Sequence, residues 1–262
     1  MSEVESAYIA PKAPELRPLN WSDILAALTA GLNDFLRAPL YGLFFGAVYA
    51  IGGLTIVLLL NAYHAPWMIL PIMIGFPLIG PFVATGVYEV SRRLETGAPL
   101  SWRAVLLTVF HQRERQMGWM AFVILFVFWM WLYLVRLLLA LFMGFNTPST
   151  LDGFLHAVLT TQSGMAFLAI GTVVGAVLAL FLFSATVVSM PLLLDSELDF
   201  VTAMITSFRA VSGSALPMLG WGVVVTVLTL LAMAPAFLGL VVVLPVLGHA
   251  TWHLYRRATV PV

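Results

Sequence analysis

The sequence predicts an all-α polytopic membrane protein with six transmembrane helices in three hairpins, each preceded by an amphipathic interfacial helix on the cytoplasmic side. Three observations lead to this prediction. The chain of 262 residues is 61% hydrophobic and 9% charged, whereas a soluble domain has about 25% charged residues. Six stretches are long and apolar enough for a helix to cross the ~30 Å hydrocarbon core of a bilayer. Nearly all charged residues fall between these stretches, on one side of the predicted membrane.

The boundaries of the crossings follow from the length of each apolar stretch, since about 20 residues span the bilayer core as a helix. The last boundary divides residues 216–252, which are almost uninterrupted apolar sequence. Pro235 lacks an amide hydrogen and suits the first turn of a helix, so we predict that the last crossing begins there. Residues 144–163 are expected to hold one short helix. The crossings are Tyr41–Ala62, Pro66–Tyr88, Met117–Met143, Gly164–Met190, Leu216–Ala234 and Pro235–Trp252.

The distribution of Lys and Arg predicts the orientation. With six crossings and the N-terminus inside, every Lys and Arg except Arg136 lies on the cytoplasmic side. A chain with five crossings would export Arg256 and Arg257, so the charges independently support a division at Pro235. Both termini are therefore predicted to be cytoplasmic. Arg136 belongs to the third crossing, where we expect it to reach the outer interface.

A similar element precedes the first, third and fifth crossings. Each copy opens with a related tripeptide, and Asn, Ser and Asp in its middle position favour the start of a helix. The tripeptides are Leu19-Asn20-Trp21, Leu100-Ser101-Trp102 and Leu198-Asp199-Phe200. The chain is thus predicted to form one membrane domain over 19–257 with repeats at 19–90, 100–190 and 198–257. Residues 1–18 are predicted to be a flexible cytoplasmic N-terminus and 258–262 a C-terminal tail.

Each of these elements carries apolar residues at helical spacing, opposed by polar residues. Such stripes are typical of helices that lie in the membrane interface or pack beneath a bundle. In the first element the apolar stripe is Trp21, Ile24, Leu25, Leu28, Leu32, Phe35 and Leu36, opposed by Ser22, Asp23, Asn33, Asp34 and Arg37.

The second crossing contains an unusual number of glycines and prolines. They include Gly75, Pro77, Gly80, Pro81 and Gly86. Broken helices line binding sites in transporters, so one interpretation is a pathway for a solute. The other is a kinked helix that packs closely against its neighbours, because glycine lets helix backbones approach in lipid. We favour close packing.

Charged and aromatic residues end the second and sixth crossings. They form a candidate polar cluster at the cytoplasmic face: Glu89, Arg92, Arg93, His249, His253 and Arg256. Because Glu89 ends one helix where His253 and Arg256 end the other, we predict a charge-assisted pair between them. Two imidazoles one turn apart could instead hold a metal ion or haem, or serve with neighbouring residues as interfacial anchors. We predict no metal and no cofactor.

Several absences argue against an enzyme. The chain has no cysteine, which excludes disulfides and cysteine nucleophiles. No Asp, Glu or Lys falls near the midplane of a crossing, so the carboxylate relays of proton-coupled transporters are missing. We find neither a nucleophile with an aligned base nor a glycine-rich phosphate loop, and no catalytic residue is predicted. The formal net charge is +0, so nothing indicates a nucleic-acid partner.

Three strings of the sequence resemble a known family. They are GFPLIGPFVATGVYEVSRRLETG (75–97), PLLLDSELDFVTAMITS (191–207) and LGHATWHLYR (247–256). Together the strings are similar to the bacterial predicted integral membrane proteins known as domain of unknown function 2189, over about 21–257. The resemblance implies a multi-pass protein of a bacterial inner membrane, and it assigns no site residue.

These observations predict a non-enzymatic accessory, scaffold or assembly component of a membrane complex. Its expected partners are the lipid bilayer and other membrane-protein subunits, through the cytoplasmic face or the lipid-facing helices. One alternative is a permease or channel for a small solute. Another is a haem, metal or quinone-binding membrane protein built on His249 and His253.

Overall fold

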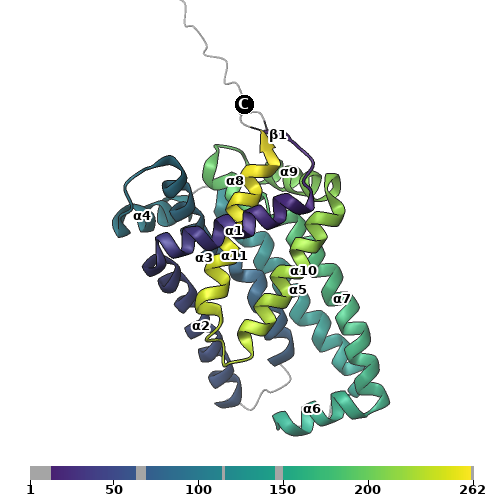
Figure 1. The fold of residues 1–262 in the computed structure, drawn as a ribbon. Coiled ribbons are helices and arrows are strands. Elements are labelled where there is room, and N and C mark those ends of the chain that lie inside the picture. The colour runs from purple at the N-terminus through teal and green to yellow at the C-terminus, as the bar shows by residue number, and fades with distance from the viewer. Residues whose placement is uncertain (1–12, 63–68, 114–115, 145–149, 261–262) are drawn as a thin grey trace, which may run out of the picture.

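The computed structural model of the protein describes residues 13–62, 69–113, 116–144 and 150–260, and within them it is a bundle of helices (Figure 1). For 59–61, 69–82, 110–113 and 151 the description covers the backbone only. The elements are β1 (Glu15–Leu16), α1 (Trp21–Arg37), α2 (Pro39–Ala62), α3 (Ile69–Thr96), α4 (Trp102–Arg113), α5 (Gln116–Met143), α6 (Leu151–Thr160), α7 (Gln162–Thr186), α8 (Ser189–Asp195), α9 (Phe200–Gly213), α10 (Ala215–Met233), α11 (Leu240–Ala258) and β2 (Thr259–Val260).

Four stretches within the described residues are long and apolar enough to cross a membrane. They are Pro39–Leu58, Gln116–Met143, Gln162–Asp195 and Ala215–Met233. Their length and composition support the predicted class, an all-helical membrane protein. Helices α3 and α11 are not among the four, and in α11 the histidines and arginines of the second half make the helix more polar. The arrangement of six crossings in three hairpins stays a prediction.

Helix α11 lies at the centre of the bundle and contacts α1, α2, α3, α8 and α10. Its second half is almost entirely buried, including Leu247, Ala250, Trp252 and Leu254. These side chains belong to the largest apolar core cluster, which also includes residues of α1, α3, α5, α7 to α10. Helix α1 crosses α11 at one end of the bundle, beside α8 and β1, and α6 lies at the opposite end (Figure 1). We call the first of these ends the α1 end.

Helix α1 packs on α11 through small and acidic residues. Ala27 is fully buried, and a Cβ added to Gly31 would lie 2.7 Å from Ala250 Cα. Asp23 and Asp34, on the polar side opposite the apolar stripe, are also buried. Within the stripe Ile24 and Phe35 are buried, whereas Trp21, Leu25, Leu32 and Leu36 are exposed. Small residues let α1 approach α11 closely, and the exposed part of the stripe is compatible with a helix that lies in the membrane interface, which stays a prediction.

The three predicted helix starts are confirmed. The side-chain oxygens of Asn20, Ser101 and Asp199 each accept a hydrogen bond from the amide three residues later. At Asn20 the cap is reciprocal, because the Asp23 carboxylate accepts from the Asn20 amide. Hydrogen bonds from Thr202 hold the pKa of Asp199 below its ordinary value. The short helix expected within 144–163 is also present, as α6.

The connection between α10 and α11 differs from the prediction. Pro235 lies in a turn over 234–239 and does not begin the last helix. Within this turn Ala236 and Phe237 have φ values of 51° and 66°, a left-handed conformation that is costly for residues with a Cβ. The buried Phe237 ring packs on Gly53 of α2, with its nearest atom 2.6 Å from where a Cβ would stand. This anchoring of Phe237 accounts for the later helix start.

The two terminal segments pair with each other. Glu15 is opposite Val260 and Leu16 opposite Thr259 in an antiparallel two-stranded sheet. Within the predicted N-terminal segment (1–18) and C-terminal tail (258–262), these four residues are thus held in a sheet, while 1–12 and 261–262 lie outside the described residues. The division of the chain into these segments stays a prediction. The pairing brings Arg17 beside Asp23, to which its guanidinium donates at 2.7 Å.

Candidate functional site

Polar side chains of three helices meet at the α1 end of the bundle. We call them the α1–α3–α11 polar cluster: Asp34 of α1, Ser91 and Glu95 of α3, and His249, His253 and Arg256 of α11. Glycine lets α3 and α11 approach here, since a Cβ added to Gly248 would lie 3.0 Å from Val87 Cγ1. The close approach places hydrogen-bonding groups of both helices within reach of Asp34.

Asp34 connects the two histidines. Its Oδ2 lies 2.7 Å from His253 Nε2, and it also receives a hydrogen bond from Ser91. The Ser91 hydroxyl in turn lies 2.7 Å from His249 Nδ1. Asp34, Ser91 and His249 are all buried. A continuous chain of hydrogen bonds therefore runs from His253 through Asp34 and Ser91 to His249.

The charge of Asp34 determines one proton position in this chain. Burial disfavours the carboxylate, but hydrogen bonds from His253 and Ser91 outweigh it and hold the pKa of Asp34 below its ordinary value. A carboxylate only accepts hydrogen bonds, so His253 Nε2 must carry a hydrogen and donate it. Ser91 has one hydroxyl hydrogen, which it donates to Asp34, so the Ser91 oxygen accepts from His249 Nδ1.

The other ring nitrogen of His249 has no hydrogen-bond partner among the described residues. His249 Nε2 is buried and, among the residues that the structure describes, no group forms a hydrogen bond with it. With its hydrogen on Nδ1, His249 leaves this atom as an unsatisfied acceptor. The lost hydrogen bond costs about 1–3 kcal/mol, and the hydrogen-bond chain ends at this buried nitrogen.

Glu89 does not form the predicted pair. Its carboxylate is fully buried and lies 2.8 Å from Arg92 Nε and 2.6 Å from Arg93 Nε. The Thr108 hydroxyl of α4 donates to it at 3.3 Å. The predicted pairing of Glu89 with His253 or Arg256 is therefore wrong. Residues three and four positions apart share one face of a helix, so the arginines of α3 itself neutralise Glu89.

A different acid joins α3 to α11. Glu95, two turns beyond Glu89, accepts from Arg256 Nε at 3.0 Å and from Trp252 Nε1 at 2.9 Å. Arg256 also donates to Asp195 of α8 at 3.3 Å. The ends of α3 and α11 are thus joined by an ion pair whose acid is Glu95, and Asp195 ties Arg256 to α8 as well.

The cluster does not resemble a metal centre. Within the described residues no group of three or more His, Asp or Glu side chains converges on one point. His253 Nε2 and His249 Nδ1 already bond Asp34 and Ser91, which leaves His249 Nε2 as a single buried nitrogen. A metal-ion centre would require more protein ligands than these described residues provide.

Sequence reasoning identified some of these residues and missed others. It predicted His249, His253 and Arg256 beside α3, but it missed their partners Asp34, Ser91, Glu95 and Asp195. A signal for Asp34 was present in the spacing of Asp23, Ala27, Gly31 and Asp34, which places small and acidic residues on one face of a helix. As a functional site, the set Glu89, Arg92, Arg93, His249, His253 and Arg256 stays a prediction.

The glycine-rich and proline-rich part of α3 is described only in part. The helix is continuous over Ile69–Thr96, but the surroundings of Gly75, Pro77, Gly80 and Pro81 lie outside the described side chains. At Gly86 the Phe45 ring of α2 occupies the position that a Cβ would take. Gly86 therefore serves close packing of α3 on α2.

The comparison with known proteins supports the membrane class. Residues 69–195 match the family described as predicted integral membrane protein (DUF2189). The match confirms the resemblance over just under half of the 262-residue chain, and the string at 247–256 lies outside it. No curated protein and no solved structure matches the chain.

Proposed function

Taking the match of residues 69–195 to this family of predicted integral membrane proteins as the premise, we propose that the protein is a non-enzymatic accessory, scaffold or assembly component of a membrane complex. In this proposal all six predicted crossings span a bacterial inner membrane, with both termini in the cytoplasm. The α1 end then faces the cytoplasm.

One observation carries the accessory role. The acids of the α1 end are engaged inside the chain: Asp34 with His253, Glu89 with Arg92 and Arg93, and Glu95 and Asp195 with Arg256. An acid held in this way is not available as a catalytic base or as a substrate ligand. The chain instead offers wide apolar faces on α5 and α7, among them Phe122, Phe126, Val173 and Val177, all exposed. Such faces suit lipid and other membrane helices.

The burial of α11 supports its assignment as a crossing. The polar residues of its second half point at α1, α3 and α8, as the bonds of His253, His249 and Arg256 illustrate. A polar helix of this kind is compatible with a membrane because its neighbours, not lipid, surround the polar groups. Its first half, from Leu240 to Leu244, is apolar.

The described contacts give less support to the permease alternative than to the accessory role. A solute pathway between α2, α3 and α11 needs space between them, but Gly46 lies against the Val241 carbonyl and Gly248 against Val87. The haem, metal or quinone alternative has only His249 Nε2 in its favour.

Purification from native membranes tests the accessory role. A C-terminally tagged chain is extracted in mild detergent and compared with an equally tagged, unrelated multi-pass protein. We expect at least one other membrane protein in constant stoichiometry with the chain and absent from the control. Recovery of the chain without any other protein would contradict the proposal. An absorbance spectrum and metal analysis of the same sample test the haem and metal alternative.

A further inference from the structure

An aromatic stripe runs along the exposed side of α5. It consists of Phe122, Phe126, Trp129 and Tyr133, each 56–67% exposed. The residues follow one another at steps of four, three and four, the spacing of the a and d positions in a heptad. At about 100° per residue they lie within roughly 60° of arc. We call this set the α5 aromatic stripe.

Two members of the stripe carry hydrogen-bond donors near the middle of the membrane. Trp129 lies at the centre of the 28-residue helix, and Tyr133 lies about 6 Å further along at ~1.5 Å per residue. Both positions fall well inside a hydrocarbon core that extends about 15 Å from its midplane. Helical side chains lean toward the N-terminus, so the Tyr133 hydroxyl leans back toward the centre.

Neither donor is satisfied within the part of the chain that the structure describes. The rings of Trp129 and Tyr133 contact each other, with centroids 6.1 Å apart, but the described residues provide no hydrogen bond to Trp129 Nε1 or to the Tyr133 hydroxyl. Lipid tails cannot accept a hydrogen bond, and Trp and Tyr are normally enriched at the membrane interfaces. The position of these two groups therefore indicates a protein partner with an acceptor.

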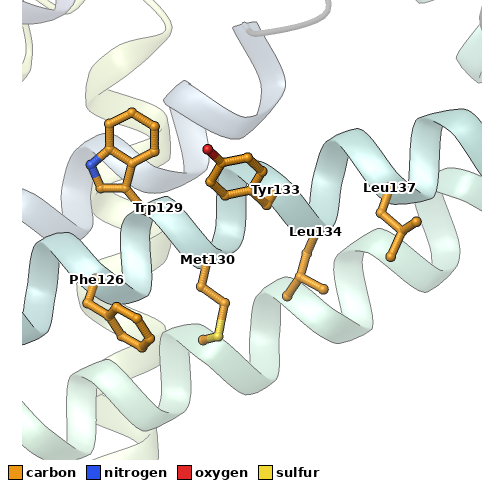
Figure 2. Close-up of a pocket in the computed structure, with 6 residues that line it drawn as sticks. All are labelled: Phe126, Trp129, Met130, Tyr133, Leu134 and Leu137. Carbon is orange, nitrogen blue, oxygen red and sulfur yellow. The ribbon is translucent and has the colours of Figure 1, made fainter.

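The surface beside these residues is shaped to receive side chains. A groove of about 370 Å³ is lined by Phe126, Trp129, Met130, Tyr133, Leu134 and Leu137. Figure 2 shows Trp129 and Tyr133 on one side of α5 and Met130 and Leu134 on the other. In a helix pair of heptad spacing, each side chain of one helix inserts between side chains of the other.

We propose that the α5 aromatic stripe is the contact between two copies of this chain in the membrane. All copies have the same orientation across the bilayer, so a twofold axis along the membrane normal places the two α5 helices parallel. Like positions then face each other. A tyrosine hydroxyl both donates and accepts. One Tyr133 hydroxyl can therefore donate to the other, and each oxygen can also accept from Trp129 of the second copy.

The stripe supplies a large part of the area that such a contact needs. Large aromatic side chains bury about 150–250 Å² each, so covering the exposed part of four removes roughly 350–600 Å² per copy. A standard interface buries about 800 Å² per partner. Neighbouring exposed residues, including Leu125 and Leu137, add to the area of the stripe.

Cysteine cross-linking in native membranes tests this contact, because the chain has no cysteine of its own. Single substitutions Phe126→Cys, Trp129→Cys and Tyr133→Cys are oxidised in the membrane. Val173→Cys and Val177→Cys on α7, at positions 62–64% exposed, are the matched controls. We expect a disulfide-linked dimer from the stripe positions and only monomer from α7.

A second measurement does not depend on the cysteine variants. Single-molecule photobleaching counts the copies of the otherwise unmodified, fluorescently tagged chain in membranes, where we expect two. Tyr133→Phe, which keeps the ring, should raise the dimer dissociation constant about threefold, the typical effect of one membrane hydrogen bond. Single copies at all densities, or cross-links from α7 but not from the stripe, would overturn the proposal. A cross-link to a different protein would overturn the identity of the partner.

The tests of the α5 contact and of the accessory role can succeed or fail independently of each other. A homodimer that purifies with no other protein would contradict the accessory role and leave the α5 contact standing. A stoichiometric complex with other proteins that contains one copy of the chain would support the accessory role and contradict the α5 contact.

Discussion

Replacing Gly31 with Ala tests how α1 docks on α11. An alanine Cβ at this position would lie 2.7 Å from Ala250 Cα and 2.8 Å from Ala250 Cβ, and closer still to the Ala250 amide nitrogen. Backbone atoms cannot rotate away, so α1 must move outward. Overpacking of this kind costs about 1–3 kcal/mol, and we expect about 3 because backbone is involved. Alanine gains about 1 kcal/mol over glycine in a helix, which leaves a net loss of about 2 kcal/mol.

Gly171→Ala is the matched control. Gly171 also lies within a helix, but an added Cβ would meet only Leu138 Cδ1, at 3.9 Å, which is ordinary contact. We expect this variant to be up to about 1 kcal/mol more stable than the wild type. Unfolding by SDS in mixed micelles, followed by circular dichroism, measures both free energies. If Gly31→Ala is as stable as Gly171→Ala, the packing of α1 against the α11 backbone is refuted.

Three further substitutions test the helix start and the polar cluster. Because the pKa of Asp34 is held below the ordinary 3.8, its stabilising effect is complete above that pH and is lost as the pH falls through the folded pKa. The thermal midpoint of the wild type should thus fall more between pH 6 and pH 3 than that of Asp34→Asn, and equal falls would contradict this pKa. Asn20→Ala should lower the free energy of unfolding by about 1 kcal/mol through loss of the cap, whereas an unchanged value would argue against the capping box. Glu95→Gln should lower the free energy of unfolding by at most about 1 kcal/mol, because the ion pair of Glu95 with Arg256 is partly exposed. A loss of several kcal/mol in the same assay would contradict this exposure of the pair.

Local signals in the sequence were sufficient to predict the starts or extents of most helices, but not the start of α11. The caps at Asn20, Ser101 and Asp199 involve atoms only three residues apart, so short-range sequence determines them. The approximate extents of α2, α5, α7 and α10 follow from apolar length alone. Close packing at Gly86 was also predictable, because few other reasons favour glycine in a membrane helix.

Partners that are distant in sequence were not predictable. Glu89 could be assigned to α11 or to its own helix, and only the rotation of α3 about its axis decides between Arg256 and the arginines at 92 and 93. The inward side of α1 depends on how closely the α11 backbone approaches Gly31. The pairing of Glu15 and Leu16 with Thr259 and Val260 joins segments at opposite ends of the chain, for which no local pattern exists.

A double-mutant cycle on Asp34 and His253 tests the central claim, that the polar cluster is a structural network joining α1 to α11. The free energies of unfolding of Asp34→Asn, His253→Gln and the double variant are compared with that of the wild type. For a partly buried contact of 2.7 Å, we expect the two losses to be non-additive by about 1–3 kcal/mol. Losses that add to within about 0.5 kcal/mol would show that the two side chains do not interact, and would contradict the account.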